Sequence, residues 1–293
     1  MSFWIWIAVR IVANPLSNVF QKLLASDRAT PLFVIGLTHG LLAIPCAGFC
    51  CLWPLPVEPA FWLNMTVCAV LALAGNVCIV QALKTSDLSI LGPVNAYKSI
   101  VSLVPGALLL HEIPGPMALA GIALIVTGSY LIVDRPRGAN RNAFVLFFSD
   151  RGVQYRLAAL VLSATEAVFL KRALLAGSPL VTFCVWGIAG FLLFALIVPV
   201  TSGKMGISRE RKVFLDRWLA YLCLAVTTGL MQFATLVVLN GFPVAAALAL
   251  FQISILLSVV LGWQVFREQN FLQRLLGSLV MVGGAVLIIF SRP

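Results

Sequence analysis

Long apolar segments separated by short polar ones dominate the hydropathy pattern of this chain. A run of about 20 apolar residues is long enough to cross the hydrocarbon core of a bilayer as an α-helix. Ten such runs are present, at about residues 3–24, 31–53, 61–83, 88–110, 116–133, 156–175, 180–200, 218–238, 243–266 and 272–290. The pattern therefore predicts an all-α polytopic membrane protein with ten transmembrane helices.

Little of the chain remains outside these runs. The longest connections cover about residues 134–155 and 201–217, which leaves no room for a soluble catalytic or ligand-binding domain. The first run has no basic leader and no clear small-residue cleavage site, so we expect a retained helix and not a signal peptide. Function is therefore expected to reside in the helices and their short loops.

The second half of the chain repeats the first. At a constant offset of 156 residues, identical residues occur at Glu112 and Glu268, Ser102 and Ser258, Gly106 and Gly262, Gly121 and Gly277, and Gly128 and Gly284. We predict a first five-helix repeat over residues 1–133, a basic connecting loop over 134–155 and a second five-helix repeat over 156–293. Because five is an odd number, the second repeat would enter the membrane inverted. Inverted repeats allow two gates around one midplane site.

Composition and charge add an orientation to this picture. With 61% hydrophobic residues, 10% charged residues and a mean hydropathy of +1.04, the chain does not fit a soluble globular protein. Fifteen Lys and Arg residues, Arg156 among them, fall at the connections after the odd-numbered runs, whereas Arg10, Lys171, Arg172 and Arg292 fall on the opposite side. The positive-inside rule then places the odd-numbered connections in the cytoplasm and both termini outside. The net charge of +10 reflects these flanking residues and does not indicate nucleic-acid binding.

Three features of the sequence form a more specific pattern. The first is the segment Asn14–Lys22 in the first run, and the second is the segment Ala82–Ser89, which is followed by Gly92–Val94 at the start of the fourth run. In each half, a Glu at the membrane edge, Glu112 or Glu268, precedes a helix with two glycines seven residues apart. Such glycines share one helix face that a neighbouring helix can approach closely, so we interpret them as structural.

In these features the chain resembles the EamA family of the drug/metabolite transporter superfamily. The resemblance implies a ten-helix, two-repeat carrier, usually an exporter of amino acids or other small metabolites. It also implies a central cavity lined by helices 1, 3, 4, 6, 8 and 9, with helices 5 and 10 at the periphery. Members are often drawn with cytoplasmic termini, in contrast to the charge count above, which we keep.

Two charged residues lie deep within the predicted helices. Lys98 is near the middle of the fourth run and Glu166 near the middle of the sixth. A charge at the bilayer centre costs about 2.5–3.5 kcal/mol or more, so few are retained without a partner or a task. Our hypothesis is that Lys98 binds a substrate carboxylate, while Glu166 binds the substrate amino group or carries a coupled proton. The structural alternative is a buried ion pair that fixes helix register.

Polar uncharged residues on the same helices extend the candidate site. Asn14, Asn18 and Gln21 recur at spacings of four and three, so they share one helix face, which should look inward. For each amide, an interhelical hydrogen bond is the alternative to substrate contact. The further candidates are Asn76, Gln81, Asn95, Tyr97, Gln232 and Gln252.

These observations favour a secondary transporter, and as a hypothesis an exporter, of small polar or amphipathic metabolites such as amino acids. It would work by alternating access around a midplane cavity, with coupling to protons. Its partners would be that small-molecule substrate, protons and membrane lipids. Its location would be the plasma membrane, which is the inner membrane in a bacterium.

The alternative from another class is an intramembrane enzyme acting on a lipid-soluble substrate. Histidine is limited to His39 and His111, and the runs contain neither paired carboxylates nor a phosphate-binding loop, so we predict no enzyme activity. The seven cysteines show no metal-ligand spacing, and we predict no metal and no other cofactor.

Overall fold

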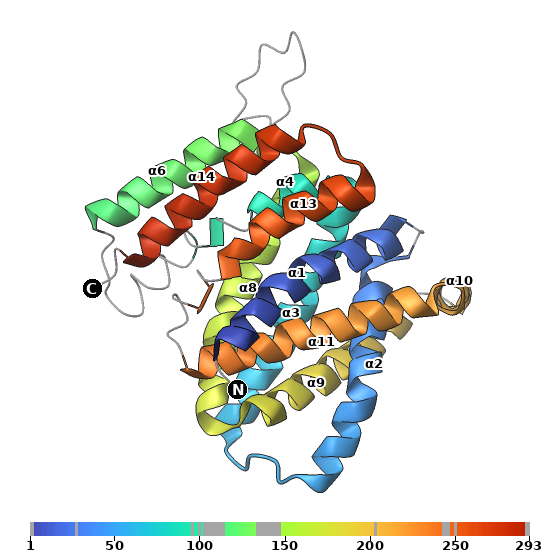
Figure 1. Cartoon of the computed structure of the whole chain (residues 1–293). Coiled ribbons are helices and arrows are strands. Elements are labelled where there is room, and N and C mark those ends of the chain that lie inside the picture. Colours follow the sequence, from blue (N-terminus) through green and yellow to red (C-terminus); the bar gives the residue numbers. More distant parts are fainter. Residues whose placement is uncertain are drawn as a thin grey trace.

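Every element in the described part of this computed structural model is helical. The structure describes residues 3–26, 29–94, 97–98, 101, 115–132, 148–201, 204–241, 247–248 and 251–290. Their helices are α1 (Phe3–Ser26), α2 (Pro31–Leu52), α3 (Pro59–Thr85), α4 (Leu88–Val94), α6 (Pro116–Ile132), α8 (Arg151–Ala176), α9 (Pro179–Thr201), α10 (Lys204–Asp216), α11 (Trp218–Gly241), the 3₁₀ turn η1 (Phe251–Ile253), α13 (Ser254–Phe266) and α14 (Phe271–Phe290) (Figure 1). The prediction of an all-helical fold is confirmed.

The helices agree with the predicted apolar runs, although membrane spans are not established for all ten. Within the described residues, α1, α2, α3, α9 and α11 are long and apolar enough to cross a membrane. Shorter apolar helices lie at Leu119–Gly128, Ser254–Phe266 and Phe271–Leu287. α8 has 26 residues, but charged residues such as Arg156 and Glu166 make it more polar than those five helices. The prediction of ten transmembrane helices is thus confirmed in part.

Local sequence explains where several of these helices begin. Pro31 and Pro59 occupy the first positions of α2 and α3, where the missing N–H costs no hydrogen bond. α8 begins after Asp150, whose side chain accepts a hydrogen bond of 2.9 Å from the Val153 backbone N–H. This cap starts α8 five residues before the predicted run, which places Arg156 inside the helix.

The helices pair as a two-fold relation between the repeats requires. α1 packs against α11 and α3 against α8, while α2 contacts α9, α4 contacts α13 and α6 contacts α14. In order along the chain, the counterparts of α1, α2, α3, α4 and α6 are α8, α9, α11, α13 and α14. If each helix is exchanged for its counterpart, the list of contacting pairs stays the same. In Figure 1, α6 and α14 lie side by side along one edge of the molecule, away from α1 and α11. The two-repeat architecture is therefore present in the packing as well as in the sequence.

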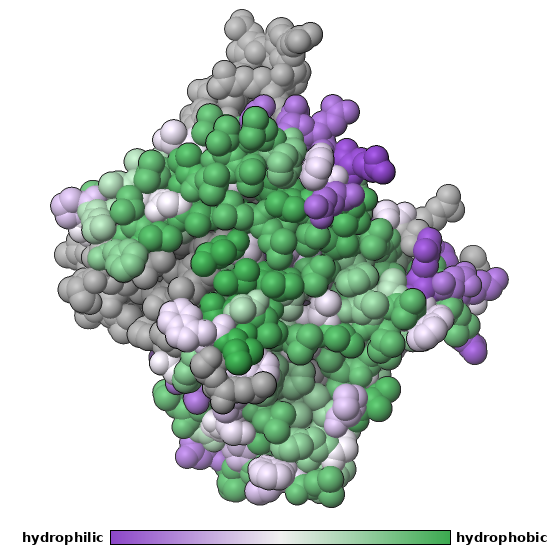
Figure 2. Space-filling model, viewed as in Figure 1, coloured by the Kyte–Doolittle hydropathy of each residue, from purple (hydrophilic) through white to green (hydrophobic). Residues whose placement is uncertain are grey.

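The outer surface suits an apolar solvent. Figure 2 shows a face dominated by hydrophobic residues, with hydrophilic side chains gathered at its edges. Large apolar side chains such as Leu63, Leu196 and Val200 are 69%, 73% and 87% exposed. Apolar exposure on this scale marks a surface in contact with another apolar phase, so the chain is an integral membrane protein.

The connection predicted at 201–217 contains a helix, α10, that the hydropathy pattern does not predict. In α10, Glu210 is buried, and its carboxylate accepts a hydrogen bond of 3.1 Å from the Thr30 backbone N–H at the start of α2. Val213 and Phe214 pack with the cluster around Tyr221 on α11. The spacing of Glu210, Val213 and Phe214 gives α10 one docked face, while Arg209, Arg211 and Lys212 stay exposed.

The predicted glycine faces of α6 and α14 meet each other. A Cβ atom on Gly284 would lie 2.5 Å from the Gly121 carbonyl oxygen, and one on Gly128 would lie 2.7 Å from the Gly277 carbonyl oxygen. Both obstacles are backbone atoms, which cannot rotate away. The interpretation of these glycines as structural is confirmed, and the same contact occurs twice, as the repeat symmetry requires.

This contact predicts opposite effects for two neighbouring substitutions. Gly284→Ala should force α6 and α14 apart and destabilise the protein by about 1–3 kcal/mol. Gly283→Ala should be neutral or slightly stabilising, because a Cβ there would meet nothing within 4 Å and alanine favours the helix. The unfolding temperature of the two variants purified in detergent measures the difference. Equal temperatures would contradict the close approach.

Candidate functional site

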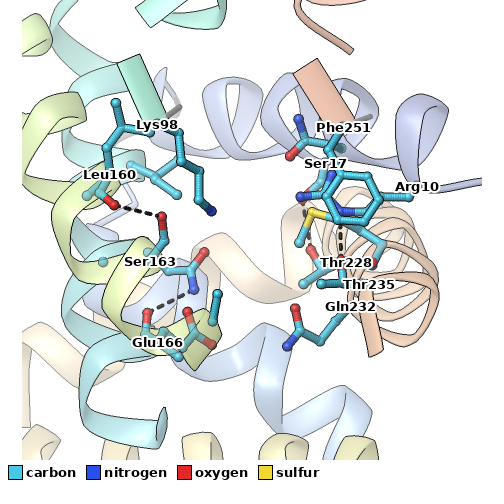
Figure 3. A pocket seen from close by; sticks show the side chains of 18 of the residues that line it. Arg10, Ser17, Lys98, Leu160, Ser163, Glu166, Thr228, Gln232, Thr235 and Phe251 are labelled. Carbon is cyan, nitrogen blue, oxygen red and sulfur yellow. Dashed lines mark hydrogen bonds between the residues drawn. The ribbon is translucent and has the colours of Figure 1, made fainter. Parts of the chain in front are cut away.

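A cavity of about 130 Å³ lies between the two repeats. Its lining comes from α1, α3, α8 and α11, with Lys98, Trp186 of α9, Phe251 of η1 and Ser254 of α13. Figure 3 shows Lys98, Ser163 and Glu166 on one side, facing Arg10, Ser17, Thr228, Gln232, Thr235 and Phe251 on the other. These helices include those that the family resemblance implied, and Trp186 on α9, the seventh predicted helix, adds to them.

Most of the residues predicted from the sequence line this cavity. They are Asn14, Asn18, Gln21, Asn76, Lys98, Glu166 and Gln232. Gln81 and Tyr97 are not among the lining residues. Tyr97 is 8% exposed and packs in the apolar core, with its ring 5.9 Å from that of Phe148. Asn95 and the side chain of Gln252 lie outside the described residues.

Lys98 and Glu166 share the cavity without touching. Their charges are near enough to interact electrostatically. Both residues are described by the structure, and no direct hydrogen bond or ion pair joins them. The backbone of Glu166 is held against α3, because its carbonyl oxygen accepts a hydrogen bond of 3.7 Å from the Cys68 thiol. Both residues line the cavity together with Trp186, which is near the Glu166 carboxylate.

Two arginines that the sequence analysis assigned to the membrane flanks also line the cavity. Arg10 lies seven residues inside α1, where its Nε donates a hydrogen bond of 2.7 Å to Thr235 Oγ1. Its guanidinium lies 4.7 Å from the centre of the Phe251 ring. Arg156 is 4% exposed and lies in the first half of α8. The flank assignment is wrong for both residues, because each helix continues past them toward the membrane surface.

A periodic signal in the sequence would have found both arginines. Arg10 precedes Asn14 by four residues and therefore extends the polar face of α1 by one turn. Arg156 precedes Ser163 by seven residues, which is two turns of α8 and the same face. The charge asymmetry that predicts the orientation persists when these two residues are removed from the count.

The polar residues divide into those already bonded and those still available. Asn14 Nδ2 donates to Ser254 Oγ at 3.2 Å, and the hydroxyls of Ser17 and Thr228 are 2.9 Å apart. These bonds join α1 to α13 and α11, the role given as the alternative to substrate contact. Buried amide atoms of three other residues have no hydrogen-bond partner among the described residues, namely Asn18 Nδ2, Gln21 Oε1 and Gln232 Nε2.

A cluster of alternating charges lies immediately beyond Gln21. Lys22 Nζ is 2.7 Å from Glu268 Oε1, and Arg274 lies 3.6 Å from Glu268 Oε2 and 3.1 Å from Asp87 Oδ2. Glu268 Oε1 also accepts a hydrogen bond of 2.9 Å from the Leu88 backbone N–H. The cluster therefore ties the end of α1 to the α3–α4 and α13–α14 junctions.

Comparison with known proteins places the chain in a family. The model of the EamA-like transporter family matches residues 3–134 and 150–290. A solved protein titled only "Crystal structure of protein" is similar in fold, with a TM-score of 0.63 and 17% sequence identity over 97% of this chain and 98% of that chain. The curated proteins contain no match to this chain.

The charge cluster predicts a large effect from a small substitution. Glu268→Gln should destabilise the protein by about 3–5 kcal/mol, because the buried charge of Arg274 and the partly buried charge of Lys22 would lose their shared partner. Glu58→Gln is the matched control, since Glu58 is exposed. The unfolding temperature in detergent gives the comparison.

A double variant separates charge pairing from other effects. If Lys22 and Glu268 interact as described, the loss in Lys22→Met/Glu268→Gln should be smaller than the sum of the two single losses. Strictly additive losses would show that the pair does not contribute to stability.

Proposed function

Because the chain belongs to the EamA-like transporter family, whose members are membrane transporters of the drug/metabolite type, we propose that it is a secondary carrier that exports small polar or amphipathic metabolites, with amino acids among the candidates. The observation that carries the proposal is the cavity at the interface of the repeats, lined by charged and amide side chains from both halves. Polar groups held at this depth in a membrane protein mark a substrate or ion pathway.

Alternating access follows from the position of the cavity. A site between two repeats becomes open to either side when one repeat tilts against the other. The cluster around Glu268 joins α1 of the first repeat to α13 and α14 of the second, so opening at this end separates Lys22 from Glu268. By the positive-inside argument, this end and α10 face the cytoplasm of the cell, and the protein resides in the plasma membrane, the inner membrane in a bacterium.

The charges in the cavity support a role in binding and coupling. Lys98 Nζ is a donor for a substrate carboxylate, and the Glu166 carboxylate is an acceptor for an ammonium group or a proton. Both line the same cavity and neither is engaged by the other. Members of this family are transporters rather than enzymes, which favours a carrier over an intramembrane enzyme.

The test of this function is transport by the purified protein in proteoliposomes. Vesicles loaded with a mixed pool of amino acids and related metabolites should lose one chemical group selectively, and an imposed pH gradient should increase the loss. Glu166→Gln should retain insertion and folding but abolish the increase caused by the gradient, because the amide cannot exchange a proton. Mass spectrometry of the vesicle contents measures both effects.

Glu58→Gln, at an exposed position, should transport like the unaltered protein. If the gradient still accelerates efflux through Glu166→Gln, Glu166 is not the coupling group. If well-inserted protein releases nothing from the pool under either condition, export of this class of metabolite is wrong.

A second substitution tests the binding role of Lys98. Lys98→Ala should weaken binding of carboxylate-bearing substrates about tenfold or more, because a hydrogen bond to a charged group contributes roughly 1.5–3 kcal/mol. Binding of substrates without a carboxylate should change little. Lys84→Ala, at an exposed position at the end of α3, is the control. Equal losses for both substrate classes would remove Lys98 from carboxylate recognition.

A further inference from the structure

The described lining of the cavity has more positive than negative charge. Arg10, Lys98 and Arg156 are basic, and Glu166 is the single acidic side chain among the described lining residues. The three basic groups lie within electrostatic range of one another. Each charge placed inside the membrane costs about 2.5–3.5 kcal/mol or more, and the repulsion between like charges adds to that cost. One carboxylate cannot neutralise three cations.

The arginines hold unused hydrogen-bond donors at the cavity. Arg156 is only 4% exposed, yet its Nε and Nη1 have no partner among the described residues. Arg10 Nη1 is likewise buried without a partner in the described part of the chain, although its Nε is engaged by Thr235. A buried donor without a partner is costly, particularly when it is charged. Guanidinium groups suit the oxygen geometry of carboxylates and phosphates.

The remaining wall limits the size and character of a ligand. Leu170, Leu239, Leu248 and Trp186 contribute apolar surface to the same cavity. Its volume of about 130 Å³ is close to that of an apolar protein cavity of roughly 150 Å³ that accepts benzene. A ligand in this conformation of the protein is therefore a compact molecule with a short carbon skeleton.

We propose that the cavity selects small molecules with two negative charges, that is, dicarboxylates or phosphate monoesters. Two ligand charges together with Glu166 balance Arg10, Lys98 and Arg156. The acidic groups accept the unused N–H groups of the two arginines, and the short carbon skeleton lies against the leucines and Trp186. This inference rests on the proposed function in one respect, that the molecule bound in the cavity is the one transported.

The test uses matched probes that differ in charge and hardly in size. Succinate, succinamate and succinamide carry two, one and no negative charges on one carbon skeleton. Propyl phosphate and its methyl ester form the corresponding phosphate pair at slightly alkaline pH. Calorimetric titration of the purified protein in lipid nanodiscs should give at least about tenfold tighter binding for the doubly charged member of at least one series, a difference of about 1.4 kcal/mol.

Variants locate the preference in the cavity. Arg10→Gln and Arg156→Gln should each reduce the affinity ratio of doubly to singly charged probes severalfold. Arg172→Gln should leave the ratio unchanged, because Arg172 lies on the exposed side of the same helix as Arg156. Two separate arginine variants keep the test valid if one of them fails to fold, which size-exclusion chromatography and the unfolding temperature would reveal.

Each outcome decides the proposal. A preference for succinate alone assigns dicarboxylates, and one for propyl phosphate alone assigns phosphate monoesters. Equal affinity within both series, no binding of any probe, or a preference that both arginine variants retain would overturn the proposal. Binding of a doubly charged probe that vesicles containing the protein do not exchange would leave this inference standing and overturn the carrier. If vesicles transport uncharged or zwitterionic amino acids and the protein binds doubly charged probes no more tightly than the other probes, the carrier stands and this inference is overturned.

Discussion

The hydrocarbon core of a bilayer contains no water to solvate a charge, and this constraint arranges the interior of the protein. Arg10, Lys98, Arg156 and Glu166 come from distant parts of the chain, yet all face one cavity. Turning any of them toward lipid would leave a charged group without a polar neighbour. The faces of α1 and α8 that carry these charges must therefore look toward the repeat interface. The apolar residues on their other faces can then contact lipid or neighbouring helices.

The scaffold is symmetric and the site is not. The glycine contact between α6 and α14 occurs twice, once for each pair of equivalent positions. In contrast, Lys98 corresponds to Ser254 at the offset of 156 residues. Ser254 accepts a hydrogen bond from Asn14 and so joins helices. Packing that must work in two inverted orientations retains its residues in both halves, whereas one asymmetric ligand needs different groups from each half. The departures from symmetry are therefore the positions at which substrate recognition is expected.

The sequence alone was sufficient to predict properties that depend on the hydropathy or the repetition of many residues. The apolar runs predicted an all-helical membrane protein, and the repeat with its glycines predicted close helix contacts of the kind that joins α6 to α14. It was insufficient to predict where one helix begins, which way one side chain faces, or which face of a short helix is docked. Arg156 lies at the end of its apolar run, and only the cap at Asp150 shows that α8 begins earlier. Tyr97 is adjacent to Lys98 but packs in the apolar core, because neighbouring helical residues face directions about 100° apart. The docked face of α10 depends on Thr30, which is 180 residues away from Glu210.

Charge balance distinguishes the two groups of ionised residues inside the protein. At the end of the cavity, Lys22 and Arg274 are matched by Asp87 and Glu268, with distances of 2.7–3.9 Å across the cluster. The two positive and two negative charges of that cluster balance each other, as expected of a contact that holds helices together. In the cavity, the basic residues exceed the single described carboxylate, and guanidinium N–H groups have no partner among the described residues. This excess of positive charge costs free energy, and a bound anion would reduce that cost. The balanced cluster therefore has the properties of a structural contact between helices, and the unbalanced cavity those of a binding site. Under the proposed function, a substrate that neutralises the cavity would lower the energy of the repeat interface, and it would move the repeats only as far as it binds one arrangement more tightly than the other.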